Sequence, residues 1–124
     1  MAKFLSKLDV EQVEDRKEEG RGTWRLLRPL VYQSDVANDT FVVPKGFVTD
    51  FASVPRIPLV FDWLGDRGNL AAALHDRLYT KPHMVRRSMA DRILLEALIV
   101  QGVPRLAALA IWLGVRIGGS SHYN

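Results

Sequence analysis

Residues 70–80 read LAAALHDRLYT and place His75 and Asp76 side by side inside an otherwise apolar run. Leucine and alanine favour helix, and Asn69 before the run suits a helix N-cap, so we expect a helix from Asn69 to about Tyr79. Burying an ionisable group without a partner is costly. The pair must therefore be satisfied by neighbouring groups or face a cleft that uses it.

Two further helices are expected after this one. The TKPH stretch at 80–83 ends the first helix, and a second is expected over 84–101, closed by Gly102. One face of the second helix should carry an apolar stripe of Val85, Met89, Ile93, Ala97 and Val100.

Pro104 suits the start of a third helix that ends near residues 118–119. The longest apolar run, residues 106–115, lies inside this helix between Arg105 and Arg116. Its ten residues are about half of the ~20 that a membrane-spanning helix needs. The run predicts a buried helix.

The first half of the chain has the pattern of strands and turns. Three extended segments are expected at 4–15, 23–34 and 40–50, with Pro29 indicating an edge or a bulge in the second and Pro44 and Gly46 interrupting the third. The expected architecture is one α+β domain over 1–124. It comprises an antiparallel β-meander at 1–49, a long proline-rich loop at 50–68, a three-helix half at 69–119 and a tail at 120–124.

Composition narrows the class of protein. The net charge of +3 comes with scattered rather than clustered arginines, which argues against nucleic-acid binding. The absence of cysteine excludes disulfides and thiol chemistry. The charged N-terminal stretch carries no secretory signal, so we expect synthesis in a cytoplasm.

Helical spacing suggests a general-base pair. If the first two helices are antiparallel, Asp91 on the second can face His75 on the first, with Arg87 one turn before Asp91 and Tyr79 one turn after His75. A carboxylate bonded to one imidazole nitrogen fixes the tautomer and leaves the other nitrogen to accept a proton from water. His75 and Asp91 are therefore the candidate catalytic residues.

Asp76 points about 100° away from His75 on the same helix. With Asp50 and loop carbonyls it could bind a hard cation such as calcium, which takes oxygen ligands in irregular geometry. A cation there would polarise a substrate carbonyl near the base.

Structural readings compete with each of these assignments. His75 could be a hydrogen-bonded core histidine, and Arg87 with Asp91 an ordinary ion pair of one helix. Asp76 could pair with a neighbouring arginine, and Asp50 could end a strand.

Residues outside the pair have simpler interpretations. His83 is expected in a solvated loop and His122 in a mobile tail. The apolar residues of 57–63 would fill the gap between the two halves or, as the less favoured alternative, contact a membrane.

Three motifs are similar to those of an uncharacterised family of small bacteriophage and prophage proteins: GFVTDFASVPR at 46–56, HDRLY at 75–79 and RSMAD at 87–91. The resemblance covers residues 24–118. Members of that family are typically encoded among late structural and lysis genes, so the resemblance implies synthesis in a host cytoplasm, incorporation in a virion or tail, and other phage structural proteins as partners.

The helical half also resembles, more remotely, the secreted prokaryotic phospholipase A2 enzymes, through HDRLY, RSMAD and WLGVRIGG at 112–119 in that order. The resemblance implies that His75 activates water, Asp91 orients it, and Asp76 with Asp50 binds calcium. The chain departs from those enzymes because it has no disulfides and because its stretch from Asp50 to His75 is proline-rich.

Two functions are therefore expected in competition. One is calcium-dependent hydrolysis of a membrane lipid ester at His75 and Asp91. The other is a non-catalytic component of a phage tail or particle, in which the same cluster is a polar core or ion site. An open cleft at His75 favours the enzyme, and an arginine plugging it favours the structural role.

Overall fold

The computed structural model describes residues 1–16, 21–49 and 69–123. Six strands occupy the N-terminal half and the helices follow in the C-terminal half, which confirms the predicted α+β class. The strands are β1 (Lys3–Phe4), β2 (Val10–Arg16), β3 (Arg21–Leu26), β4 (Leu30–Ser34), β5 (Asp39–Val43) and β6 (Val48–Thr49). The helices are α2 (Asn69–Tyr79), α3 (Arg87–Val100), α4 (Arg105–Gly118) and the short α5 (Ser120–Tyr123).

The strands form two three-stranded antiparallel sheets rather than one meander, in the orders β1-β4-β5 and β2-β3-β6. The division falls at Pro29, where the expected second segment separates into β3 and β4. Proline has no N–H to give to a ladder, so the chain leaves one sheet and enters the other there. Backbone hydrogen bonds between Leu26 and the Gly46–Phe47 turn join the end of β3 to the chain that leaves β5.

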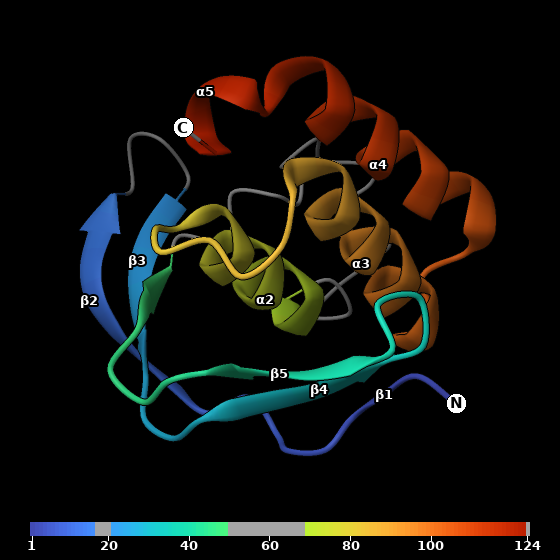
Figure 1. The fold of residues 1–124 in the computed structure, drawn as a ribbon. Coiled ribbons are helices and arrows are strands. Elements are labelled where there is room, and N and C mark those ends of the chain that lie inside the picture. Colours follow the sequence, from blue (N-terminus) through green and yellow to red (C-terminus); the bar gives the residue numbers. More distant parts are fainter. Residues whose placement is uncertain (17–20, 50–68, 124) are drawn as a thin grey trace.

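Helix α2 is the centre of the molecule. It lies in the corner between the two sheets, with α3 on its far side and α4 packed outside α3 (Figure 1). Alanines 71–73, Leu74 and Leu78 are fully buried. A helix covered on several faces has this largely apolar sequence, so the run of His75, Asp76 and Arg77 within it is exceptional.

The predicted helix ends agree closely with the structure at α2 and α4. Helix α3 ends as expected, because Gly102 has a positive φ of 87° and the Gly102 and Val103 N–H groups bond back to Ile99 and Leu98. Its start is three residues later than predicted, because Arg86 is extended and serves as the N-cap. No helix within the described ranges has the length and apolar character to cross a membrane.

Two predicted burial patterns are wrong. Val100, placed on the apolar stripe of the second helix, is exposed, and the buried face of α3 runs through Ala90, Ile93, Leu94, Ala97 and Leu98. Helix α4 was expected to be buried, yet only Ala108 and Ile111 along it are. It packs on α3 with one face and leaves the opposite face uncovered.

Candidate active site

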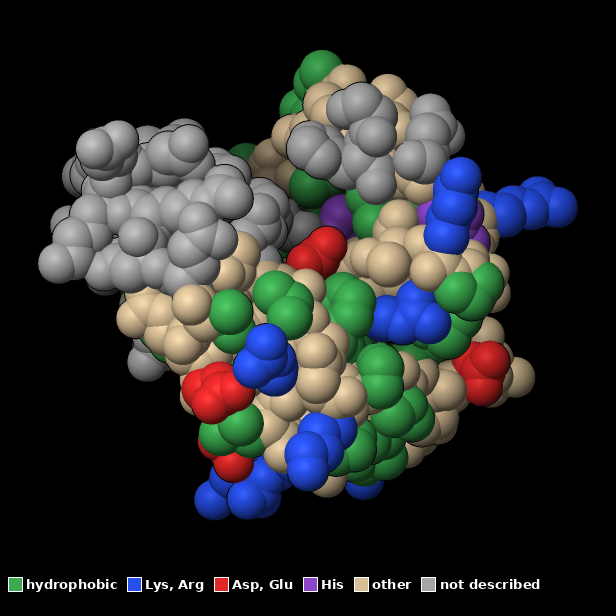
Figure 2. All heavy atoms as spheres, turned by 90° about the vertical axis from the view of Figure 1, so that its left-hand side faces the viewer, with side chains coloured by type: hydrophobic (Ala, Val, Ile, Leu, Met, Phe, Trp, Pro, Cys, Tyr) green, Lys and Arg blue, Asp and Glu red, His purple; other side chains and the backbone are tan. Residues whose placement is uncertain are grey.

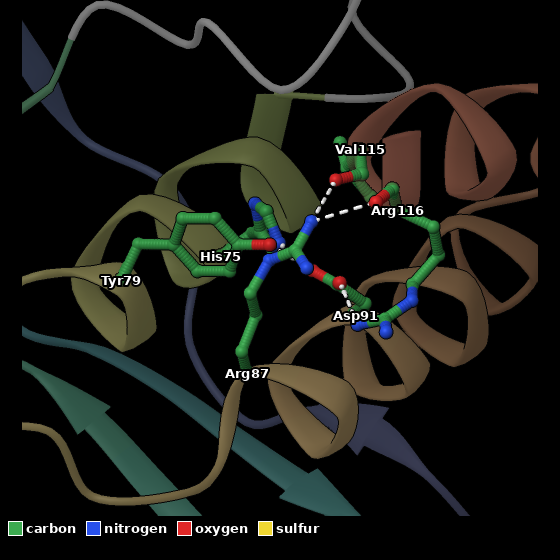
Figure 3. Close-up of polar contacts among 6 residues, drawn as sticks. All are labelled: His75, Tyr79, Arg87, Asp91, Val115 and Arg116. Atoms are coloured by element: carbon green, nitrogen blue, oxygen red, sulfur yellow. Dashed lines mark hydrogen bonds and ion pairs between the residues drawn. The ribbon is translucent and has the colours of Figure 1, made fainter. Parts of the chain in front are cut away.

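His75 and Asp91 meet between α2 and α3, which run side by side through the core. Imidazole Nε2 lies 2.8 Å from Asp91 Oδ1, and the side chains are 3% and 0% exposed (Figure 3). The contact is the one that the helical spacing predicts. Because both groups are withdrawn from water, the geometry of this bond is fixed by the packing of the two helices.

Asp91 of α3 accepts hydrogen bonds from three side chains on two other helices, α2 and α4. Besides His75, the Tyr79 hydroxyl on α2 donates to Oδ1, and Arg116 Nη1 on α4 donates to Oδ2 at 2.8 Å. Burial alone would raise the pKa of Asp91, but the bonds from His75, Tyr79 and Arg116 outweigh it and hold that pKa below its ordinary value. Asp91 is therefore a carboxylate at neutral pH.

The charge on Asp91 determines which imidazole nitrogen carries the proton. A carboxylate only accepts, so Nε2 of neutral His75 must be the protonated nitrogen in this bond. Nδ1 is then the nitrogen with the lone pair, able to accept a proton. This is the tautomer that a general base acting through Nδ1 requires.

Tyr79 lies one turn after His75 on α2, and the two rings pack with centroids 4.1 Å apart. Burial, together with the hydrogen bond to Asp91, raises the pKa of the Tyr79 hydroxyl far above its ordinary value. The hydroxyl thus remains a donor to Asp91 throughout the physiological range. Its ring also meets the Tyr123 ring of α5 edge-on, at 5.3 Å.

Arg87 does not form the ion pair with Asp91 that was the structural alternative for these two residues. Its Nη2 donates instead to the backbone carbonyls of Val115 and Arg116, at 2.7 and 2.8 Å (Figure 3). The Val115 carbonyl also accepts the Gly119 N–H, and a cation is favourable beside the carbonyls in the last turn of a helix. Arg87 therefore caps α4 from the first residue of α3 and positions the turn that carries Arg116.

The two residues predicted to bind a metal are not brought together in what the structure describes. Asp76 is half-buried on α2, and Asp50 lies outside the described residues. The described ranges contain no group of three or more histidine, cysteine or acidic residues that could hold a metal. Calcium takes six to eight oxygen ligands, so Asp76 and its described neighbours do not make that site by themselves.

His83 and the chain end differ from their predicted states. His83 is half-buried, stacks on the Tyr123 ring with centroids 3.8 Å apart, and its Nε2 lies 3.1 Å from the Tyr79 carbonyl oxygen. The Tyr123 hydroxyl donates to the Val85 carbonyl at 2.6 Å. Residues 120–123 are thus a short helix packed beside Tyr79, since aromatic contacts hold it there.

Two features of the polar core were not predicted from the sequence. The contact of Arg116 with Asp91 was not assigned, because nothing in the spacing relates the end of α4 to α3. Glu96 of α3 was also missed. Its carboxylate accepts from the Tyr32 and Ser34 hydroxyls and the Val36 N–H, at 2.7–2.8 Å. A single acidic residue inside the apolar run ILLEALIV of α3 was the available signal.

The surface has no dominant charge on the side that Figure 2 presents. Lysine and arginine side chains there are interspersed with acidic and apolar ones. An electrostatic footprint for a nucleic acid would need a continuous basic patch. The described part of this face therefore shows no such patch.

Fold and site together define a small α+β protein in which a histidine, a tyrosine and an arginine surround one buried aspartate. The family model described as "Protein of unknown function (DUF1353)" matches residues 24–115, and the chain belongs to that family. The match includes His75, Tyr79, Arg87 and Asp91. No curated protein and no solved structure matches the chain.

Proposed function

We propose that the protein hydrolyses a lipid ester, with His75 as the general base and Asp91 as the residue that orients it. The observation that supports the proposal is the buried 2.8 Å contact between His75 Nε2 and an ionised Asp91. It makes Nδ1 the nitrogen that would accept a proton from water.

The proposed reaction begins when Nδ1 of His75 takes a proton from water and the resulting hydroxide attacks the ester carbonyl carbon. The tetrahedral intermediate collapses with cleavage of the acyl–oxygen bond. The imidazolium returns its proton to the leaving alkoxide, which gives a free fatty acid and a lyso product. Asp91 stabilises the transient imidazolium and remains a carboxylate throughout.

Calcium belongs to this proposal through Asp76 and Asp50, the residues that would contribute to binding it. The ion would polarise the ester carbonyl. The described residues do not form this site on their own, so the steps above use only His75 and Asp91.

A second candidate function is favoured by the burial of the cluster. His75 is only 2% exposed, and Arg116 and Arg87 lie on the α4 side of Asp91. A polar network that joins three helices in this way is also what a non-catalytic scaffold would use. We propose that role, as a component of a phage tail or particle assembled in the host cytoplasm with other phage structural proteins, as the alternative. It draws on the motif resemblance described above.

The two functions are separated by measuring fatty-acid release from vesicles of phosphatidylcholine and phosphatidylglycerol, with and without calcium. The hydrolase predicts release by the wild type, and a loss of about 10²–10⁴-fold in His75→Gln, which retains an amide donor for Asp91 but no base. His83→Gln, a histidine outside the cluster, is the matched control and should retain activity. Circular dichroism establishes that each variant is folded. A folded wild type that releases no fatty acid from either lipid would support the scaffold.

A further inference from the structure

The uncovered face of α4 is an apolar feature that the packing of the described elements leaves unexplained. Leu106, Leu109, Leu113 and Ile117 recur three or four residues apart, so they lie along one side of the helix. They are 83%, 39%, 52% and 77% exposed. Side chains this apolar form a contiguous stripe that water solvates poorly.

The charged residues of α4 itself are both arginines, Arg105 and Arg116. From Ala97 to Asn124 the chain has no acidic residue, whereas Arg105 begins α4 and is exposed. An apolar helix face bordered by arginine matches a bilayer surface that contains anionic lipid, because the leucines enter the acyl boundary while the arginine meets the head groups.

A second copy of the chain fits this face less well. A standard protein interface takes about 20–30 residues from each partner. The α4 stripe supplies four side chains. A helix lying flat on a membrane has no such area requirement, and the 14 residues of α4 give a length of about 21 Å, enough to lie in the interface and too short to cross it.

We propose that α4 binds peripherally to anionic phospholipid bilayers through the stripe of Leu106, Leu109, Leu113 and Ile117. The binding does not depend on hydrolysis. It deepens the proposed function only by naming the surface that brings the protein to its lipid. In this orientation the C-terminal end of α4, where Arg116 holds Asp91, is also at the membrane side of the molecule.

The test uses vesicles of diether phospholipids, which contain no ester bond, so binding is measured even if the protein has no hydrolytic activity. Co-sedimentation is compared between phosphatidylcholine alone and an equal mixture with phosphatidylglycerol. We expect binding to the mixture, weakened by added salt, and little binding to phosphatidylcholine alone. The double variant Leu106→Ser/Ile117→Ser should weaken binding by at least about tenfold.

Val42→Ser is the matched control, because Val42 is a half-exposed apolar residue of β5, away from α4, and its replacement should leave binding unchanged. Equal binding by the wild type and the double variant would overturn the proposal. So would concentration-dependent dimerisation without lipid that the double variant abolishes, since the occupant would then be a second copy. A wild type that binds diether vesicles but does not hydrolyse ester lipids would contradict the proposed reaction and leave the proposed membrane binding standing.

Discussion

At the scale of single residues, the molecule depends on one buried carboxylate. Asp91 is fully buried and receives His75, Tyr79 and Arg116 on its two oxygens. Asp91 lies on α3 and its donors lie on α2 and α4, so the three helices are coupled through this one side chain. The stability of the molecule should therefore respond more strongly to Asp91 than to any surface charge.

Asp91→Asn should destabilise the protein by about 2–3 kcal/mol, because the amide can accept on only one atom and leaves a buried donor without its bond. Urea unfolding followed by circular dichroism measures the change. The control is Asp9→Asn, which breaks the exposed pair between Asp9 and Arg28 and should cost less than about 1 kcal/mol. Equal decreases in the free energy of unfolding of the two variants would show that Asp91 contributes no more to stability than an exposed ion pair.

The lowered pKa of Asp91 predicts how stability depends on pH. Below the ordinary aspartate pKa of about 4 the unfolded chain binds a proton that the folded protein does not, so acid favours unfolding. The contribution of Asp91 is complete above that pH and is lost as the pH falls through the lower folded value. In urea titrations at several pH values, the wild type should lose stability over this window, and the gap to Asp91→Asn should shrink. A gap that stays constant down to the most acidic folded sample would contradict the assignment.

The candidate site was largely predictable at this scale, and the reason is local. His75, Tyr79 and Asp91 lie on two helices joined by a short connection, so periodicity alone places them face to face. The Arg87 contacts and the Arg116 bond were not predictable, because they depend on how α4 packs after a separate turn. The spacing of Arg87 and Asp91 on α3 suggested an ion pair within that helix. In the structure Arg87 donates instead to the backbone carbonyls at the end of α4.

At the scale of elements, the end of α4 is fitted closely against α2. Gly119 follows α4 directly, and a Cβ built on it would collide with the Val115 carbonyl oxygen and lie 3.0 Å from the Tyr79 hydroxyl. Only glycine lets the chain approach Tyr79 in this way. The same turn holds the carbonyls that Arg87 caps, so crowding here is transmitted to the site.

Gly119→Ala should therefore destabilise the protein by about 1–3 kcal/mol and disturb the hydrogen bond from Tyr79 to Asp91. The neighbouring variant Gly118→Ala is an unusually close control, because a Cβ there meets nothing within 4 Å. Thermal unfolding of both variants gives the comparison. If Gly118→Ala were the more damaging of the two, the proposed close approach at Gly119 would be wrong.

Glu96 joins the β1-β4-β5 sheet to α3, because its carboxylate accepts several hydrogen bonds as that of Asp91 does. Tyr32, Ser34 and Val36 all donate to its carboxylate, and burial together with this acid raises the pKa of the Tyr32 hydroxyl far above its ordinary value. Glu96→Gln should cost about 1–3 kcal/mol, since one of the three donors would face an NH₂ group. Glu11→Gln, on an exposed pair with Arg25, serves as its control in the same denaturation assay. A loss no larger than that of Glu11→Gln would exclude a structural role for the Glu96 carboxylate.

The ends of elements were predictable where glycine or proline marks them. The pairing and the covering of elements were less predictable, because one pattern fits several arrangements. Gly102 and Pro104 mark the end of α3 and the start of α4, and both ends lie where expected. The strands were located but not their sheets, because alternation along a strand says nothing about which neighbour pairs with it. The exposure of α4 was missed for a related reason, since an apolar run does not reveal which of its sides another element covers.

At the scale of the whole molecule, a central helix carries the candidate base, a second orients it, and a third contributes Arg116 while presenting an apolar face outward (Figure 1). Helix α4 therefore takes part in both proposals: its Arg116 binds Asp91, and its exposed apolar face is the proposed membrane contact. A lipid-bound molecule would hold its buried cluster on the side of its substrate. Membership in the family is established independently of both proposals.

The central claim is that His75 acts as a general base and activates the water that attacks a lipid ester. We would test it by running the vesicle reaction in ¹⁸O-labelled water and analysing the products by mass spectrometry. Hydrolysis at the acyl carbon predicts label in the carboxylate of the released fatty acid, none in the lyso product, and no labelled acid above background from His75→Gln. A folded wild type that yields no labelled fatty acid, with or without calcium, would contradict the claim and leave the cluster as a scaffold that holds three helices together.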